Sequence, residues 1–141
     1  MLIHGACHCG NLSFKLNWLP EPAEIPARAC SCSFCVKHGG VWTSCATGSL
    51  RVAVQEAGLV STYAFGTRTA DFHVCTRCGV VPVVSCRLDD RLYAVVNVNA
   101  FEGVPASLLR HATANFDGEE EAARLERRRR YWIADLDFQE A

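Results

Sequence analysis

Nine cysteines in a chain of 141 residues are the feature that most limits how this protein can fold. Seven of them fall in three short clusters, which are Cys7 and Cys9; Cys30, Cys32 and Cys35; and Cys75 and Cys78. The odd total excludes complete disulfide pairing within one chain, and clusters of this kind indicate metal binding rather than a disulfide framework. Cys45 and Cys86 stand alone in strand-like segments, where we expect buried, inert side chains.

Length and composition favour a single domain that spans residues 1–141, with a core of about residues 2–118 and its own apolar interior. Half of the residues are apolar, and 14 basic residues stand against 15 acidic ones. This balance argues against a nucleic-acid partner. Every apolar run is far shorter than the roughly 20 residues of a membrane-spanning helix, and no signal peptide is recognisable. We therefore expect a cytoplasmic protein without membrane contact, and the oligomeric state stays open.

The pattern of apolar residues predicts a mainly β protein. Alternation of Leu12, Phe14 and Leu16 with polar residues is typical of a half-buried strand. Glycine and Asp89-Asp90 turn signals separate the other β-rich segments, which we predict as strands at residues 41–46, 49–54, 60–65, 69–74, 80–87 and 91–97. The proline-rich stretch from Trp18 to Pro26 predicts an irregular connection.

One helix is predicted, from Gly118 to Trp132, with Asp117 as its N-terminal cap. Glutamates in its first turn and the Arg127–Arg130 run in its last turns complement the helix dipole. The pairs Glu120–Arg124 and Glu126–Arg130 have the i,i+4 spacing of helical ion pairs. The arginine run is also the feature that favours a nucleic-acid partner most, but a solvated helix end explains it better.

The number of clustered cysteines suggests two kinds of zinc site. A structural zinc ion is held by four protein ligands, whereas a catalytic zinc ion keeps one position open. Seven cysteines divide into a closed site with four and an open site with three, and spacing alone does not say which pair joins which. His38 or His73 remains an alternative fourth ligand for the three.

The motifs Gly5-x-Cys7-x-Cys9-Gly10, Cys30-x-Cys32-x-x-Cys35-x-Lys37 and Cys75-x-x-Cys78-Gly79 resemble, in this order, those of the glutathione-dependent formaldehyde-activating enzyme family, whose domain centromere protein V shares. Asn97-Val98-Asn99 and Asn115-Phe116-Asp117-Gly118 are similar to its later motifs. The resemblance spans about residues 5–118. It implies a β-tent fold of antiparallel sheets around a structural zinc ion.

The same resemblance implies the ligand sets and the activity. Cys7, Cys9, Cys75 and Cys78 would hold the structural zinc ion, and Cys30, Cys32 and Cys35 a second one that faces the substrate. The family name refers to the formation of S-hydroxymethylglutathione from glutathione and formaldehyde, which is a carbon–sulfur lyase reaction read in reverse.

A zinc ion with three thiolates carries a formal charge of −1 and suits the binding and exchange of thiols. We therefore predict a zinc-dependent carbon–sulfur lyase that acts on glutathione-type thiols and small aldehydes. His38 is a candidate proton shuttle, and Lys37 a candidate partner for a substrate carboxylate. Alternatively, both are solvent-facing loop residues. A non-catalytic zinc module and a glutathione carrier or sensor remain the alternative functions.

Overall fold

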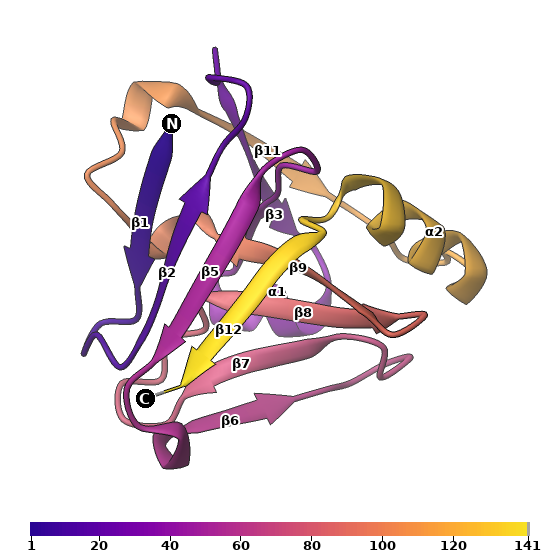
Figure 1. The fold of residues 1–141 in the computed structure, drawn as a ribbon. Helices are drawn as coiled ribbons and strands as arrows, with labels where there is room; N and C mark the ends of the chain where they lie inside the picture. The colour runs from indigo at the N-terminus through magenta and orange to yellow at the C-terminus, as the bar shows by residue number, and fades with distance from the viewer. Residues whose placement is uncertain (141) are drawn as a thin grey trace.

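A computed structural model describes residues 1–140, which form two β-sheets and two α-helices (Figure 1). The first sheet has the order β10 (Phe101–Glu102), β1 (Leu2–Ala6), β2 (Leu12–Asn17), β5 (Ser49–Val54) and β12 (Asp135–Glu140). The second has the order β11 (Leu109–Ala114), β3 (Ile25–Cys30), β4 (Val41–Thr43), β9 (Arg91–Asn97), β8 (Val83–Leu88), β7 (Asp71–Cys75) and β6 (Val60–Tyr63). The helices are α1 (Ser33–His38) and α2 (Glu121–Tyr131), and three 3₁₀ turns lie at Ala57–Leu59, Val98–Ala100 and Ala106–Leu108. The prediction of a mainly β protein with one main helix is confirmed.

The main core lies between the two sheets, whose strands run across one another in Figure 1. Strand β2 contributes its alternate residues Leu12, Phe14 and Leu16, as the sequence predicts, and β5 does the same with Leu50 and Val52. Because successive side chains of a strand point to opposite faces, each of these strands keeps its other face toward solvent.

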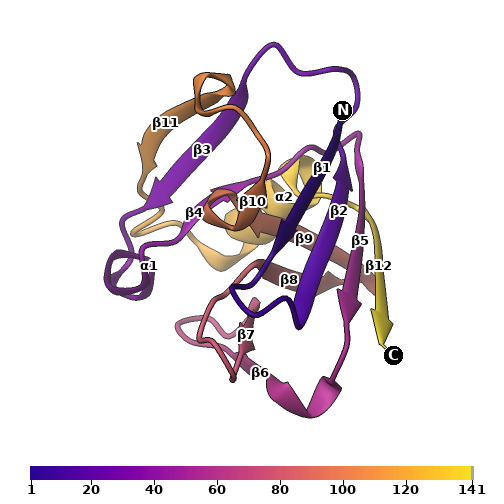
Figure 2. The ribbon, with the colours of Figure 1, turned by 90° about the vertical axis from the view of Figure 1, so that its left-hand side faces the viewer.

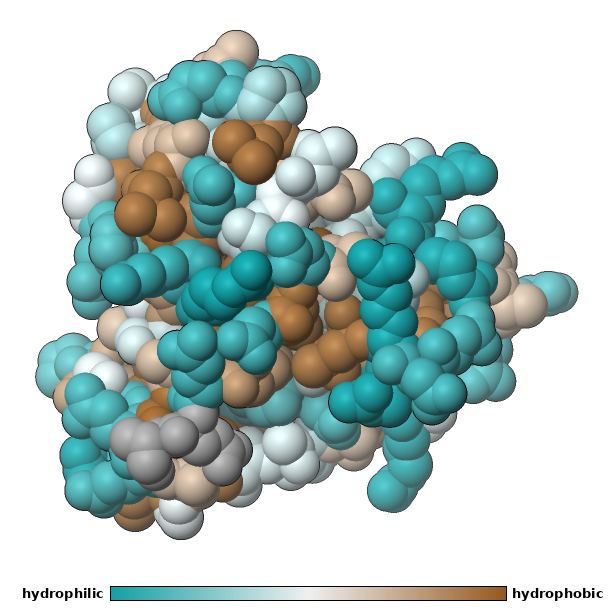
Figure 3. Space-filling model, in the orientation of Figure 1, coloured by the Kyte–Doolittle hydropathy of each residue, from teal (hydrophilic) through white to brown (hydrophobic). Residues whose placement is uncertain are grey.

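Strands β8 and β9 are buried on both faces because α2 covers the side that turns away from the first sheet. A second apolar cluster there joins Val84 and Val95 to Trp132, with Leu125 of α2 packed against it. Two backbone hydrogen bonds between Ala94 and Ile133, of 2.9 and 3.0 Å, fix the chain after α2 to β9. On the face seen in Figure 3, hydrophobic surface lies between the hydrophilic residues over β12 and those over α2.

The sheets are mixed rather than antiparallel throughout, which corrects one part of the prediction. Strand β12 pairs with β5, and β11 pairs with β3, in parallel. Both pairs join segments far apart in the chain, and Figure 2 shows β12 at the edge of its sheet. A parallel pair needs a long crossover connection. The chain between β3 and β11 provides one, and the chain between β5 and β12, which includes α2, provides the other.

The main helix is shorter than predicted, and Asp117 is not its cap. A turn closed by the Glu119 N–H bond to the Phe116 carbonyl comes first, with Gly118 at a φ of 80°. The helix then begins after Glu120, which makes no side-chain capping bond.

The ion pairs of the helix also differ from the predicted i,i+4 pairs. Arg124 pairs with Glu119, and Glu126 pairs with Arg129 at i,i+3. The Arg127–Arg130 run is not one solvated face either, since Arg128 is buried. The proline-rich stretch includes the start of β3, which the sequence analysis missed. Neither helix of residues 1–140 has the length and apolarity needed to cross a membrane.

Candidate metal centres and the adjoining pocket

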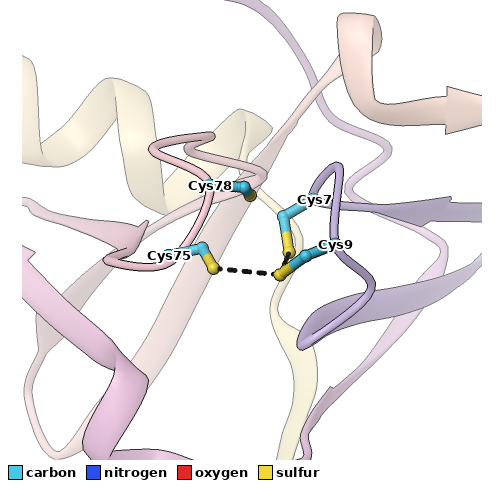
Figure 4. A group of neighbouring side chains, drawn as sticks. All are labelled: Cys7, Cys9, Cys75 and Cys78. Carbon is cyan, nitrogen blue, oxygen red and sulfur yellow. Dashed lines mark hydrogen bonds between the residues drawn. The ribbon is translucent and has the colours of Figure 1, made fainter.

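Two turns, one from each sheet, bring four cysteines together. Cys7 and Cys9 lie on the turn between β1 and β2. Cys75 is the last residue of β7, and Cys78 lies on the turn that follows it (Figure 4). The four sulfur atoms lie within 4.8 Å of one another. The Sγ atoms of Cys7 and Cys9 are 3.7 Å apart, and those of Cys9 and Cys75 are 3.5 Å apart.

The surroundings of these thiols combine burial with hydrogen bonds from the backbone. Burial raises the pKa of the Cys7 thiol to about 12. The Asn11 N–H lowers the pKa of Cys9. Burial acts to raise the pKa of Cys78, but N–H donors of the backbone and the neighbouring thiols outweigh it and lower this pKa to about 6. Near neutral pH some thiols of this group therefore still carry a proton. A metal ion that binds to them would displace these protons.

The remaining clustered cysteines form a second group at the end of β3 and the start of α1. The sulfur atoms of Cys30, Cys32 and Cys35 lie within 4.8 Å of one another. The N–H of Cys32 donates to Cys30 Sγ over 3.5 Å, and the N–H of Cys35 donates to Cys32 Sγ over 3.4 Å. Trp42 Nε1 donates to Cys35 Sγ over 3.3 Å. Each sulfur thus receives one N–H donor, which favours the thiolate form.

Two thiols of this second group have pKa values that are shifted in opposite directions. The hydrogen bond from the Cys35 thiol lowers the pKa of Cys30 to about 5, against the effect of burial. The same hydrogen bond, followed by burial, raises the pKa of Cys35 well above its usual range.

Both groups fit a tetrahedral metal ion with sulfur ligands. Zinc–sulfur bonds of about 2.3 Å require sulfur atoms about 3.8 Å apart at the corners of a tetrahedron. The distances of 3.5 and 3.7 Å in the first group are close to this value and far from the roughly 2.05 Å of a disulfide. All nine cysteines are free thiols. The first group offers four ligands and the second three.

The two groups differ in what lies beside them. Cys30, Cys32 and Cys35 line a pocket of about 370 Å³, and none of the four cysteines of the first group does. The pocket runs from α1 to α2, and aromatic side chains make much of its wall. These are Trp42, Phe65, Phe72, Phe116, Tyr131 and Trp132.

The pocket also has a basic side that the sequence analysis did not identify. Four arginines line it: Arg28 of β3 and Arg124, Arg127 and Arg128 of α2. Burial, followed by the neighbouring charge of Arg127, lowers the pKa of Arg28. Arg28 lies on the same face of β3 as Cys30, which follows two residues later. The alternation of side chains along a strand is therefore a sequence signal that places Arg28 beside the cysteines. The α2 residues carried no such signal, because the packing of α2 on β8 is long-range.

Trp42 connects the pocket to the second cysteine group. It is half-buried in β4, lines the pocket and bonds to Cys35. Gly40 makes this position possible, since a Cβ atom there would lie 2.6 Å from the Trp42 ring.

Lys37 and His38 lie in the last turn of α1 rather than in a loop. They line a different cavity, of about 470 Å³, with Phe34, Tyr63 and Phe65. Neither His38 nor His73 joins the three cysteines within the described part of the chain. His73 instead bonds through Nε2 to Ser85 Oγ over 2.7 Å, and burial lowers its pKa.

The two isolated cysteines, Cys45 and Cys86, are buried and belong to neither group. Cys45 donates to the Leu19 carbonyl, and Cys86 Sγ accepts a bond from Arg128 over 3.5 Å.

Comparison with known proteins identifies relatives of this architecture. A protein from Rhodobacter sphaeroides with a known crystal structure is 36% identical, with a TM-score of 0.57 over 74% of this chain and 92% of that one. The family model described as glutathione-dependent formaldehyde-activating enzyme matches residues 2–115, which include all seven clustered cysteines. Residues 116–140, with α2 and β12, lie beyond this match. The chain therefore belongs to the glutathione-dependent formaldehyde-activating enzyme family.

Proposed function

We propose that the protein joins a thiol to a small aldehyde, and splits the adduct again, at a zinc ion held by Cys30, Cys32 and Cys35. The observation that carries this proposal is that the group with three thiols lines the pocket of about 370 Å³, and the group with four has no part in that lining. A second zinc ion, held by Cys7, Cys9, Cys75 and Cys78, has a structural role in this proposal. Glutathione and formaldehyde are the substrates that the family suggests.

The reaction is an addition without a change of oxidation state. The carbon–sulfur bond forms between the thiol sulfur and the aldehyde carbon, and the thiol proton goes to the carbonyl oxygen. A zinc ion with one open position supplies Lewis acidity that promotes loss of the thiol proton. The reverse direction breaks the same bond and returns the aldehyde and the thiol.

The protein's own residues hold the reacting groups in place. The Trp42 N–H and two backbone N–H groups hold the sulfur ligands in their charged form and fixed orientation. The aromatic wall, which includes Phe72 and Trp132, excludes bulk water and leaves room for a small aldehyde beside the cysteines. Lys37 and His38 line another cavity, so this proposal gives them no part.

The test follows the exchange of ¹³C-formaldehyde between its hydrate and its glutathione adduct by exchange NMR spectroscopy. The adduct forms without protein, so the rate at equilibrium is the quantity to compare. We expect the protein to accelerate exchange and Cys32→Ser to abolish the acceleration. Cys45→Ser makes the same replacement at a cysteine outside both groups and should keep it. Zinc content per chain is measured on the same samples, with two ions expected for the native protein and one for Cys32→Ser.

Two results would contradict the proposal. With two zinc ions bound and no accelerated exchange, the protein is a thiol carrier or sensor, which needs the same open site without turnover. With one zinc ion bound and no thiol binding, it is a non-catalytic zinc module.

A further inference from the structure

Part of the pocket lining comes from a segment outside the family match. Residues 116–140 contribute Phe116, Asp117, three arginines of α2 and Trp132 to the pocket lining. A pocket formed only by the matched residues would lack this basic side, apart from Arg28. The segment beyond the match therefore supplies three of the four arginines that line the pocket together with the three thiols.

Among the side chains at the pocket, arginines outnumber carboxylates. Four arginines line the pocket, against the carboxylate of Asp117 and that of Glu119 behind the wall. Glu119 is shared by Arg127, at 3.0 Å, and Arg124, at 3.4 Å. Within the described part of the chain, neither Arg28 nor Arg128 makes an ion pair.

Two residues that line the same pocket have buried polar groups without partners. Arg128 is 7% exposed, and its Nη1 atom donates to Thr69 Oγ1 over 2.7 Å, but its Nε atom has no hydrogen-bond partner. The hydroxyl of Thr43, which is fully buried, also lacks one. A buried guanidinium without a counter-charge is costly, and so is a buried hydroxyl without a hydrogen bond. An anion in the pocket would supply the counter-charge that Arg128 lacks.

Apolar and basic residues share this pocket with the three thiols. Trp42 and Phe72 contribute apolar wall, and α2 contributes three arginines. Arg127 is held by Glu119 and stacks 3.7 Å above the Phe116 ring, which keeps its charge at the wall. A ligand that fits combines a thiol, an apolar part and an anionic group.

We propose that Arg28 and the arginines of α2 form an anion subsite that binds the carboxylate of the thiol substrate. The substrate class is a thiol that carries a carboxylate on a compact, partly apolar body. Planar carboxylates match the forked donors of arginine, and a desolvated pocket strengthens the attraction. This assignment rests on the proposed function for its thiol, but the subsite itself can be tested without a thiol.

The first experiment uses 3-phenylpropionate and its uncharged counterpart 3-phenylpropionamide as probes that lack sulfur. Binding to the full-length zinc-loaded protein is measured by calorimetry and by ¹⁵N NMR shifts of arginine Nε groups. We expect the carboxylate to bind at least about tenfold tighter than the amide. Arg28→Gln should reduce carboxylate affinity about tenfold and leave amide affinity unchanged.

Two further variants make the test specific. Arg128→Gln should weaken carboxylate binding in the same way, and circular dichroism shows whether this buried substitution disturbs folding. The result for Arg28→Gln does not depend on that outcome, because Arg28 is half-exposed. Arg130→Gln is the matched control, because Arg130 lies on the same helix, exposed and outside the pocket lining. Equal affinity for the two probes, or equal weakening by Arg130→Gln, would overturn the subsite.

The second experiment separates this proposal from the proposed function. In the exchange assay, Arg28→Gln should raise the KM for 3-mercaptopropionate and leave the KM for 2-mercaptoethanol, which has no carboxylate, unchanged. If no thiol shows accelerated exchange but 3-phenylpropionate still binds and needs Arg28, the catalytic proposal fails and the subsite stands. If both thiols respond equally to Arg28→Gln, the subsite fails and catalysis stands.

Discussion

At the scale of single residues, the two cysteine groups differ in the donors that surround them. In the group with three thiols, the indole N–H of Trp42 reaches Cys35 Sγ from outside the cysteine motif. A donor of this kind orients the sulfur ligand and removes part of its charge. Trp42 holds its position because Gly40 has no side chain that would meet the ring. The affinity of this site thus depends on residues that are not ligands.

Replacing Trp42 by phenylalanine should therefore weaken the second metal site and spare the first. The substitution keeps an aromatic ring in the pocket and removes the N–H···S bond. We expect zinc affinity at Cys30, Cys32 and Cys35 to fall about 10-fold to 100-fold, measured by competition with a chromophoric chelator. Trp18→Phe is the control, since Trp18 lies in the main core. Equal loss in both variants would show that the indole bond does not tune the metal.

The same replacement at two cysteines should have unequal consequences. Cys75→Ser removes a ligand of the group that joins both sheets, so we expect loss of zinc and a large fall in melting temperature. Structural zinc contributes about 10–16 kcal/mol in zinc-finger peptides. Cys32→Ser should remove one metal ion and leave the fold largely intact. Zinc analysis and thermal unfolding of both variants test this, and an equal loss of stability would contradict the division into closed and open sites.

At the scale of elements, α2 is fixed at its start by a side chain that precedes it. Glu119 accepts two bonds from Arg127, from Nε over 3.0 Å and from Nη2 over 3.1 Å. The bond from Arg127, against burial, lowers the pKa of Glu119 below its usual 4.5. A carboxyl whose pKa falls on folding binds fewer protons in the folded state. Its stabilising effect is therefore complete above pH 4.5 and is lost as the pH falls through the folded pKa.

Glu119→Gln should accordingly lower stability in a pH-dependent way. At pH 7 we expect a loss of about 1 kcal/mol in the free energy of unfolding, measured with urea. The difference from the native protein should shrink as the pH falls below 4.5, because the native carboxyl becomes protonated there. Loss of metal at low pH affects both proteins alike and cancels in the comparison. A difference that stays constant with pH would mean that Glu119 acts through its shape rather than its charge.

Elements with a clear local pattern were predictable, and those defined by distant contacts were not. The β8–β9 hairpin follows from the Asp89-Asp90 turn, where both residues have positive φ. Strand β11 has mostly exposed residues and exists because β3 pairs with it, so it has no alternation to detect. Helix α1 has only six residues, too short for a helical period.

The same contrast applies to the candidate site. The cysteine spacing indicates both metal groups, since ligands of one turn are close in sequence. The basic side of the pocket needs the docking of α2 on β8 and β9 through Leu125 and Trp132, which no local pattern encodes. Arg28 is the exception, because its place two residues before Cys30 puts both on one face of β3.

At the scale of the whole molecule, the two cysteine groups connect very different parts of the fold. The group with four thiols joins the β1–β2 turn of one sheet to the turn after β7 of the other, next to the main core. The group with three thiols lies within one continuous segment, from the end of β3 through α1. Loss of metal from the first should loosen the contact between sheets, whereas loss from the second should change only one side of the pocket.

Removal of metal by a chelator should therefore proceed in two steps with different structural effects. EDTA in excess should take one zinc ion quickly from the group that lines the pocket, with far-ultraviolet circular dichroism and melting temperature almost unchanged. The second ion should leave slowly and together with unfolding, because Cys7 and Cys75 are almost completely buried and both turns must separate to release it. Metal release is followed with a chromophoric indicator and structure by circular dichroism on the same time scale. In Cys32→Ser only the slow step should remain. If both ions leave in one step with unfolding, the two groups are parts of a single structural unit and the open site is not separable from the fold.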